Sequence, residues 1–350
     1  MRKVGGKETK RHVLVDGNNL IYRAYYVNVE NRINSRLPLM SSPDGYPTGV
    51  IYGSLDMLAN WLYSIPDITK ISVFFDGHSK RRKELDPTYK SNRTGGPGLK
   101  LQTTHTSQNQ LERTLRDGYL ATGEVDILAH LLGLLGCDVY HHPEEEADDL
   151  IASFCKLNPD SIRFIVSSDK DFFQLLSDPR IICYVPGLDG DRFFDTEKST
   201  KYWTKFNKGN HPAVPPTHVR MFKALCGDTS DAVKGIERLR KKVAVPLCHH
   251  TSVDELYATG LPGFSDSEKE KATIMLEKIR VNYELVGLNS SVDTSTCLRP
   301  LEKNYGMGNL ILQDLGINSI DMNAFRDTPV QVPRQENPPG IPTESWLLDI

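Results

Sequence analysis

Short apolar runs alternate with longer stretches of helical periodicity along the first half of the chain. The runs are rich in β-branched and aromatic residues, and each ends in polar or turn residues. Nearly continuous apolar strands separated by helices predict an α/β fold, with a central, mostly parallel sheet and helices on both faces. The expected strands are HVLVDG (12–17), ISVFFDG (71–77), CDVYHHP (137–143), RFIVSSDKD (163–171) and RIICYV (180–185).

Carboxylates follow these strands. Asp16 closes the first strand, Asp76 the second, and Asp169 and Asp171 the fourth, while the helix after the third strand begins with five acids between Glu144 and Asp149. Ligands of parallel sheets bind at the carboxyl ends of the strands. Helix caps and turns would explain one acid at each place, but they do not explain the doublets. Oxygen ligands with no nearby Cys or His set favour Mg²⁺ or Mn²⁺, and so a site suited to phosphoryl chemistry.

The acid-rich helix start contains two kinds of residue. Helical periodicity places Glu146 and Asp149 on one flank of an apolar stripe, and Asp148 about 100° further round. We expect these three to belong to the metal site. Glu144 and Glu145 are expected to compensate the helix dipole or to be solvated.

A second acidic motif lies in ALCGDTSDAVKGIERLRKK (224–242). Asp228 and Asp231 are three residues apart, as two residues on one helical flank would be. We expect the pair to complete the metal site, and the basic residues after it to hold a phosphate backbone. A charged exterior helix is the alternative. The basic candidates are Lys234, Arg238, Lys241 and Lys242.

A basic insertion separates the second and third strands. From His78 to Arg116 there are nine Lys or Arg against three Asp or Glu. The segment leaves the sheet beside Asp76, so it could fold over a polyanion there, although basic segments are usually solvated surface. Its candidate nucleic-acid contacts are Arg81, Arg82 and Tyr89. Bases could also stack on Tyr22, Tyr25 and Tyr26, or these rings could be ordinary core residues.

Composition limits the classes of protein that remain. The 350 residues carry a net charge of −3, but without the nine candidate site acids 36 acids face 42 bases. No apolar stretch suits a membrane span or a signal peptide, and the six cysteines form no C-x-x-C pair. We expect a monomeric cytoplasmic protein, in the host cytoplasm if the chain is viral. P-loop and complete dinucleotide-binding motifs are absent from the sequence.

Five motifs together resemble the 5′ nuclease superfamily, which includes flap endonucleases, polymerase I 5′ nuclease domains and bacteriophage 5′ exonucleases and RNase H-type primer-removal nucleases. The resemblance spans about residues 12 to 245, and the length without a polymerase domain is most similar to the bacteriophage members. The motifs are VDGNNLIYR (15–23), FFDGHSKRRKELDPTYKSNR (74–93), EEEADDLIASF (144–154), SSDKDFFQLLSD (167–178) and KALCGDTSDAVKGI (223–236).

The resemblance implies metal-dependent hydrolysis of phosphodiesters near the 5′ end of DNA or RNA/DNA strands at duplex junctions. It implies 5′-3′ exonuclease and flap endonuclease activity, RNase H activity and removal of RNA primers. Two or more Mg²⁺ ions, with Mn²⁺ as a substitute, would act with catalytic Lys90, Arg93, Asp169 and Asp171, and Arg23 would lie near the bound 5′ region. The implied metal ligands are Asp16, Asp76, Glu146, Asp148, Asp149, Asp169, Asp171 and Asp231, with Asp228 in support.

The sequence departs from the family at one place. Gly235-Ile236 runs directly into Glu237-Arg238, where family members have a glycine-rich hairpin that clasps the duplex. The resemblance therefore implies a remodelled duplex grip and does not extend to a monovalent cation site there. The metal ligands do not depend on this hairpin.

The expected organisation has four parts. They are a basic N-terminal tail (1–11), an α/β nuclease core (12–190) with a basic helical arch at about 78–122, a helical duplex-binding and C-terminal region (191–326), and a Pro-rich flexible tail (327–350). The tail ends in ESWLLDI, which a sliding clamp or single-strand-binding protein could dock, or which could be a terminus without a partner.

Two other functions remain open. A topoisomerase-primase type metal enzyme would use Glu146, Asp169 and Asp171 and would not need Asp16, Asp76 or Asp231. A structure-specific nucleic-acid-binding protein would keep the acids without turnover. The complete carboxylate set argues against the second alternative.

Overall fold

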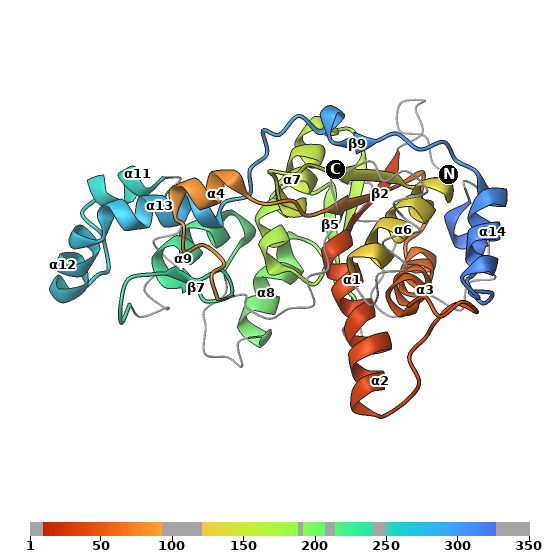
Figure 1. The fold of residues 1–350 in the computed structure, drawn as a ribbon. Coiled ribbons are helices and arrows are strands. Elements are labelled where there is room, and N and C mark those ends of the chain that lie inside the picture. The colour runs from red at the N-terminus through yellow and green to blue at the C-terminus, as the bar shows by residue number, and fades with distance from the viewer. Residues whose placement is uncertain are drawn as a thin grey trace.

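A seven-stranded sheet is the centre of the computed structural model (Figure 1), which describes residues 10–92, 121–187, 192–206, 214–239, 250 and 252–326. Its order is β6-β5-β4-β1-β2-β3-β9, and the two short edge strands are antiparallel to their neighbours. The prediction of a mostly parallel sheet is confirmed. The strands are β1 (Arg11–Asp16), β2 (Lys70–Phe75), β3 (Asp138–His141), β4 (Ile162–Val166), β5 (Ile181–Tyr184), β6 (Phe193–Phe194) and β9 (Leu298–Arg299).

Side chains of successive strand residues enter two different hydrophobic clusters. In β1, Leu14 belongs to one cluster, while Val13 and Val15 belong to the other, because strand side chains alternate between faces. Helices therefore cover both faces, as predicted. The first cluster includes α7 (Ala147–Leu157), the 3₁₀ helix η2 (Lys170–Leu175), α9 (Val219–Cys226) and α13 (Leu276–Val286); the second includes α1 (Gly17–Tyr25), α3 (Gly49–Tyr63), α6 (Ala121–Leu134) and α14 (Tyr305–Asp314).

The strand order creates a switch point beside β1. The chain runs outward from β1 through β2 to β3, then crosses back so that β4 lies on the other side of β1. Crossovers that leave in opposite directions open a crevice at the carboxyl ends of the two strands between them. The crevice between β1 and β4 is where Asp16 and Asp169 emerge.

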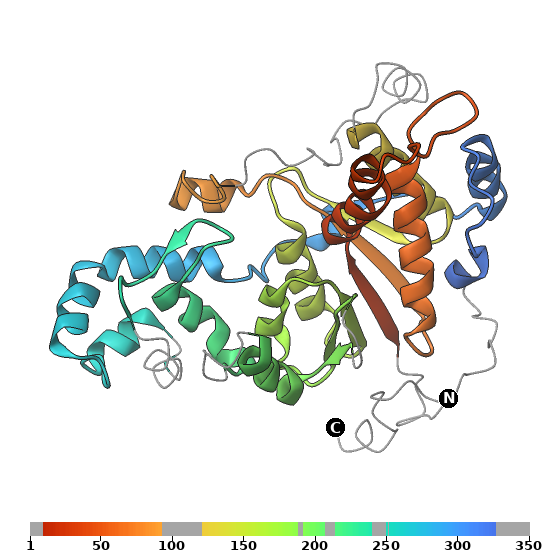
Figure 2. The same ribbon diagram turned by 90° about the horizontal axis from the view of Figure 1, so that it is seen from below.

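Helix α4 and the helices between residues 219 and 286 form a second region, at the left of Figures 1 and 2. There α13 packs against α9, and against α4 at the start of the basic insertion. This region contains α4 (Lys80–Leu85), α9, the hairpin of β7 (Gly227–Asp228) and β8 (Val233–Lys234), α11 (Val253–Ala258), α12 (Asp266–Ile274) and α13. The other elements are η1 (Tyr26–Glu30), α2 (Asn31–Asn34), α8 (Thr196–Phe206), η3 (Pro216–His218), η4 (Thr294–Thr296) and η5 (Met322–Phe325).

The end of the described chain returns to the sheet. Strand β9 pairs with β3, and α14 packs against α6. Residues 298–325 therefore join the core, although the sequence grouped them with the region after residue 190. Residues 1–9 of the predicted N-terminal tail, the whole C-terminal tail and most of the predicted arch, including Arg93, lie outside the described residues, as do Lys241 and Lys242; Arg11, predicted as tail, begins β1. Within the described ranges, no helix is both long enough and apolar enough to span a bilayer.

A buried carboxylate from α6 caps helix α3. Thr48, which precedes α3, makes no side-chain cap, and the N–H of Val50 instead donates to Oε1 of Glu124 at 3.0 Å. The Glu124 side chain is 3% exposed. Burial raises the pKa of Glu124 from 4.5 to about 7, although the backbone donors oppose the shift. The carboxyl therefore stabilises the fold most when it is protonated.

Glu124→Gln should flatten one component of the pH dependence of folding. The pKa of Glu124 is raised in the folded state, so its contribution is full below pH 4.5 and is lost as the pH rises through about 7. Relative to Glu124→Gln, the wild type should lose about 2 kcal/mol between pH 5 and pH 8. Urea unfolding at both pH values measures this difference. Parallel profiles would contradict the assignment, and Glu270→Gln, on the exposed α12 surface, is the control.

Candidate active site

Asp16 joins the ends of β1 and β4 at the switch point. Its Oδ1 accepts from the N–H of Asn19 at 2.9 Å, and its Oδ2 accepts from the Ser167 hydroxyl at 2.8 Å. Asn19 Nδ2 donates to Ser168 Oγ at 2.6 Å across the same crevice. None of these three residues was predicted to belong to the site, although Asn19, Ser167 and Ser168 lie inside the VDGNN and SSDKD motifs. They fix where the Asp16 carboxylate points.

Asp76 joins β2 to the acid-rich helix. Its own N–H donates to Asn18 Oδ1 at 2.9 Å, and its Oδ1 accepts from the N–H of Ala147 at 2.8 Å. Asp76 therefore caps helix α7, whose preceding residue, Glu146, makes no side-chain cap. Helix capping, the alternative to a metal site, therefore does occur at Asp16 and Asp76. Each cap uses only one oxygen of its carboxylate.

The acids lie close enough to influence one another. Burial raises the pKa of Asp16 to about 7, and the charge of Asp76 contributes. Burial likewise raises the pKa of Asp76 to about 6, with contributions from Glu146 and Asp148 that Lys90 partly offsets. Carboxylates that raise one another's pKa values favour a bound cation.

A second group of acids lies beside the first. We call the two groups together the acidic bowl: Asp16, Asp76, Glu146 and Asp148, and Asp169, Asp171, Asp228 and Asp231. Carboxylate oxygens of Asp171, Asp228 and Asp231 all lie within 4.8 Å of one another. Asp169 connects this group to the first, because the charges of both Asp148 and Asp231 act on it. Asp169 also accepts from the N–H of Asp171 at 2.9 Å at the start of η2, and its side chain is open to solvent.

Asp228 and Asp231 do not share a helical flank, which corrects the prediction from their spacing. Asp228 ends β7, and Asp231 lies in the turn before β8. Close backbone contact requires glycine on both sides of this hairpin: Gly227 has φ +82°, and a Cβ at Gly235 would lie 2.2 Å from the carbonyl carbon of Cys226. A three-residue spacing is equally compatible with a turn, and the two glycines permit the close backbone contact that the hairpin requires.

Lys223 is a site residue that the sequence analysis missed. Its ammonium contacts the Asp171 carboxylate and donates to Asp228 Oδ2 at 2.7 Å. Although burial opposes the shift, Lys223 lowers the pKa of Asp228. The available signal was its place at the start of the KALCGDTSDAVKGI motif, in the last turn of α9 and five residues before Asp228.

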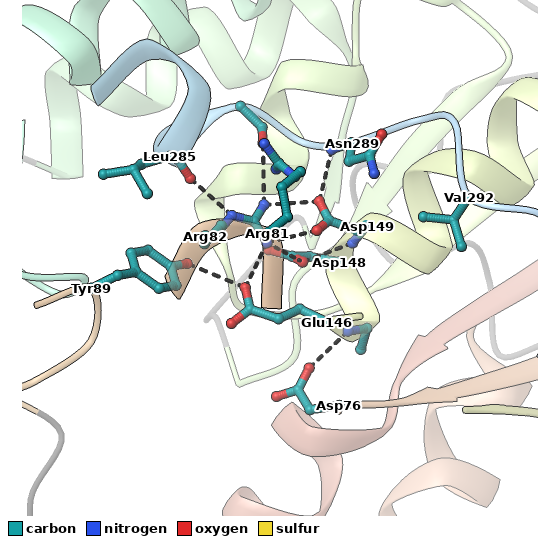
Figure 3. A network of polar contacts seen from close by, with 12 residues as sticks. Asp76, Arg81, Arg82, Tyr89, Glu146, Asp148, Asp149, Leu285, Asn289 and Val292 are labelled. Atoms are coloured by element: carbon teal, nitrogen blue, oxygen red, sulfur yellow. Dashed lines mark hydrogen bonds and ion pairs between the residues drawn. The ribbon is translucent and has the colours of Figure 1, made fainter. Parts of the chain in front are cut away.

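Arg82 is not on an exposed basic surface, where the sequence placed it (Figure 3). Its side chain is 2% exposed, and its guanidinium contacts Asp149 at 2.6 and 2.8 Å and Glu146 at 2.7 Å. Asp149, itself fully buried, also accepts from the N–H of Asn289 at 2.7 Å. Both Asp149 oxygens are therefore occupied by protein donors, which differs from the expected role of a metal ligand.

Tyr89 and Lys90 extend from the basic insertion to the acids. Tyr89 is 3% exposed, so it cannot offer a stacking face as expected; its hydroxyl lies 3.2 Å from Glu146 Oε2 and 3.1 Å from Asp231 Oδ2. Lys90 Nζ donates to Glu146 Oε1 at 2.8 Å. Although burial opposes the shift, Glu146 and Asp231 raise the pKa of Lys90, so it carries a proton and cannot be a base.

The other predicted nucleic-acid contacts lie in several places. Arg23 is partly buried and donates to the Pro186 carbonyl at 3.2 Å, and Arg81 donates to the Glu284 carbonyl at 3.2 Å. Lys234, at the end of the acidic hairpin, and Arg238, which follows it, are exposed. Only this exposed pair has the accessibility that a phosphate contact needs among these four residues.

The donor set fits hard divalent cations. Carboxylates follow the ends of β1, β2, β3 and β4, and the oxygens that converge most closely in the described part of the chain are all from Asp: Asp171, Asp228 and Asp231. Mg²⁺ and Mn²⁺ prefer such oxygen ligands, whereas zinc sites usually include Cys or His.

The family model for the 5′-3′ exonuclease N-terminal resolvase-like domain matches residues 11–204, which is more than half of the chain. The chain belongs to the 5′-3′ exonuclease family. Its 5′ nuclease resemblance is thereby confirmed. The matched residues include the strands that position Asp16, Asp76, Glu146 and Asp169, but not the hairpin of Asp228 and Asp231.

Two relatives represent this exonuclease family at different lengths. The chain is 27% identical to a 5′-3′ exonuclease of Aquifex aeolicus over 285 residues, which covers 80% of this chain and 82% of the relative. It is 29% identical over 236 residues to DNA polymerase I of Mycobacterium tuberculosis, which covers 66% of this chain but 22% of that polymerase. The chain is therefore similar to a limited part of that longer polymerase.

Solved structures of this exonuclease family share the fold. A bacteriophage T5 flap endonuclease in a pseudo-enzyme-product complex with DNA and metal ions has a TM-score of 0.58 and 16% identity, covering 88% of this chain and 100% of that one. Flap endonuclease-1 of Methanococcus jannaschii has a TM-score of 0.53 and 16% identity, covering 89% and 88%. Another bacteriophage T5 5′-exonuclease structure contains divalent zinc ions.

Gly235→Ala should damage both the hairpin and the acidic bowl. The new Cβ would lie 2.2 to 2.4 Å from backbone atoms of residues 225–227, so the hairpin must shift and move Asp228 and Asp231. We expect a loss of about 1–3 kcal/mol in unfolding free energy. Calorimetry and metal titration measure the two effects.

Gly306→Ala is the matched control for this substitution. Its Cβ would meet only Asn304 Oδ1 at 3.5 Å, on helix α14. Unchanged stability and metal affinity in Gly235→Ala would contradict the role given to the close glycine contact.

Proposed function

We propose that this chain is a divalent-metal-dependent 5′ nuclease that cleaves phosphodiesters near the 5′ end of a strand at a duplex junction. The observation that carries the proposal is the acidic bowl at the β1–β4 switch point, with the Lys90 ammonium at 2.8 Å from its Glu146. Family membership supports hydrolysis of nucleic acid. Open carboxylates together with a fixed cation suit a phosphodiester, which brings its own negative charge.

Two sets of carboxylates would hold Mg²⁺, with Mn²⁺ as a substitute. Bound divalent ions would polarise a phosphoryl oxygen, activate a water molecule and stabilise the leaving oxygen. The zinc and metal ions named for the bacteriophage T5 structures support a metal site in the same fold. The proposed ligands are Asp16, Asp76, Glu146 and Asp148 in one set, and Asp169, Asp171, Asp228 and Asp231 in the other.

The residues of the chain itself would position the substrate. Lys90 is protonated and held at the rim of the bowl, so it can bind a phosphate oxygen when the phosphate competes with Glu146. Arg93 follows three residues later and would add a second cation. Lys234, at the end of the hairpin, and Arg238, which follows it, are exposed and would contact the backbone of the duplex.

We assign the chain to exonuclease and flap endonuclease action, with removal of RNA primers and RNase H activity as the finer hypothesis. The DNA polymerase I relatives support a place in replication, and the flap endonuclease neighbours support a branched DNA substrate. Docking of a clamp or single-strand-binding protein through the tail belongs to the same hypothesis.

Asp169→Asn should abolish cleavage while leaving the fold intact. Asp169 is solvent-open, so its loss removes a proposed ligand without opening a cavity. Cleavage of a 5′-labelled flap in Mg²⁺ should fall on the order of 10³-fold. Asp160→Asn is the matched control, because Asp160 is exposed before β4, at the opposite edge of the sheet. A wild-type protein that leaves the flap intact in both Mg²⁺ and Mn²⁺ would falsify the proposal.

Asp16→Ala separates the alternatives. Asp16 holds the β1 end to Ser167, so we expect its loss to stop cleavage. Retained activity would favour the topoisomerase-primase type site. Flap binding by the wild type without turnover would favour a non-catalytic binding protein.

Substrate preference can be measured on a flap and an RNA-primed duplex run side by side. If primer removal is the function, both substrates should be cut in Mg²⁺, and the RNA strand should be shortened from its 5′ end at a comparable rate. Product lengths on a gel measure this directly. A flap rate that exceeds the RNA rate by orders of magnitude would exclude the primer hypothesis while leaving the nuclease proposal intact.

A further inference from the structure

Arg82 lies where three segments meet that are far apart in the sequence. It belongs to α4, at the base of the basic insertion, and contacts the first turn of α7 and residues 285–289 after α13. Figure 3 shows its guanidinium between Asp149, Glu146 and Leu285. At 1% residue exposure, Arg82 has no access to a nucleic acid on the surface.

Every N–H donor of the Arg82 guanidinium has a partner. Arginine has five such donors in a planar fork. The Nε donor reaches the Leu285 carbonyl at 2.9 Å, Nη1 reaches Glu146 Oε2 at 2.7 Å and Asp149 Oδ2 at 2.6 Å, and Nη2 reaches Asp149 Oδ1 at 2.8 Å and the Gly287 carbonyl at 3.1 Å. A full set of partners fixes the guanidinium in one orientation.

Asp148 Oδ1 lies 3.7 Å from Arg82 Nη1, and the two carboxylates that accept hydrogen bonds from Arg82 differ in which oxygens remain available to a metal ion. Asp149 gives both oxygens to Arg82 and one also to the Asn289 N–H, so it forms a closed pair. Glu146 receives Arg82 and Tyr89 on Oε2, while among the described residues Oε1 accepts only from the ammonium of Lys90. Arg82 therefore sets the direction in which Oε1 of Glu146 faces the bowl.

We propose that Arg82 is a positioning residue that sets the affinity of the acidic bowl for divalent cations. It acts through Glu146, whose carboxylate it orients, and it is itself held by Asp149 and by the backbone after α13. The effect of Arg82 on catalysis rests on the proposed nuclease function. Its test in metal binding does not need that function.

Lysine cannot replace Arg82 in this role. An ammonium has three donors without a planar fork, so it cannot serve two carboxylates and two carbonyl groups in the same plane. Arg82→Lys keeps the charge opposite Asp149 and loses the geometry. Outer-shell partners of metal ligands typically change metal affinity by about 10- to 100-fold when they are replaced.

The experiment measures Mn²⁺ binding by electron paramagnetic resonance, without nucleic acid. Arg82→Lys should bind Mn²⁺ about 10-fold or more weakly than the wild type. In a flap cleavage assay it should need correspondingly more Mg²⁺ for half-maximal rate, with the KM for the flap unchanged at saturating Mg²⁺. The matched control is Arg81→Lys. The neighbouring Arg81 donates to the Glu284 carbonyl and, within the described part of the chain, to no carboxylate.

A double variant covers the case in which Arg82→Lys does not fold. Arg82→Met with Asp149→Met removes both buried charges together, and such exchanges are often tolerated because no lone charge stays buried. Glu146 still loses its donor, so Mn²⁺ binding should remain weak. Wild-type Mn²⁺ affinity in either folded variant would overturn the proposal.

A different pattern would assign Arg82 to nucleic acid instead. A raised KM for the flap with unchanged Mn²⁺ affinity would overturn the positioning role in favour of a phosphate contact. The proposed function fails separately, if the wild type binds Mn²⁺ but does not cleave the flap.

Discussion

Mutual repulsion of carboxylates at one edge of the sheet is the constraint on which the rest of the structure depends. The chain supplies counter-charges of its own: Arg82 for Asp149 and Glu146, Lys90 for Glu146, and Lys223 for Asp171 and Asp228. These three cations differ in accessibility. Arg82 is sealed in the interior, whereas Lys90 and Lys223 retain partly accessible side chains. An entering cation or phosphate can compete with the two lysines, but not readily with the arginine.

Sheet topology and helix capping together position the acids of the bowl. The switch point brings the β1 and β4 ends together, and Asp16 and Asp76 then use one oxygen each to tie helix starts to the strand ends. A carboxylate fixed by a backbone N–H loses little conformational entropy when a ligand arrives. The caps, which a purely structural interpretation would treat as the whole explanation, therefore also preorganise the site.

The sequence predicted most of the sheet, because alternating and continuous apolar runs directly report burial on two faces. The five long strands and the acids at their ends follow from that pattern. Arg82, Tyr89 and Lys223 could not be placed in the same way. Their positions depend on partners between 5 and 205 residues distant, and a basic run has the same appearance whether it faces water or a buried carboxylate. The hairpin of Asp228 and Asp231 was missed because a three-residue spacing fits a helix and a turn equally well.

The return of the chain to the sheet has a consequence for its boundaries. Every proposed metal ligand lies before residue 232, yet β9 covers the outer edge of β3 and α14 covers α6. A protein shortened to the catalytic motifs would keep all its ligands and expose a parallel strand edge together with an apolar helix face. Unpaired edges of this kind template association between chains. Residues 298–314 therefore protect a site to which they contribute no ligand against association between chains.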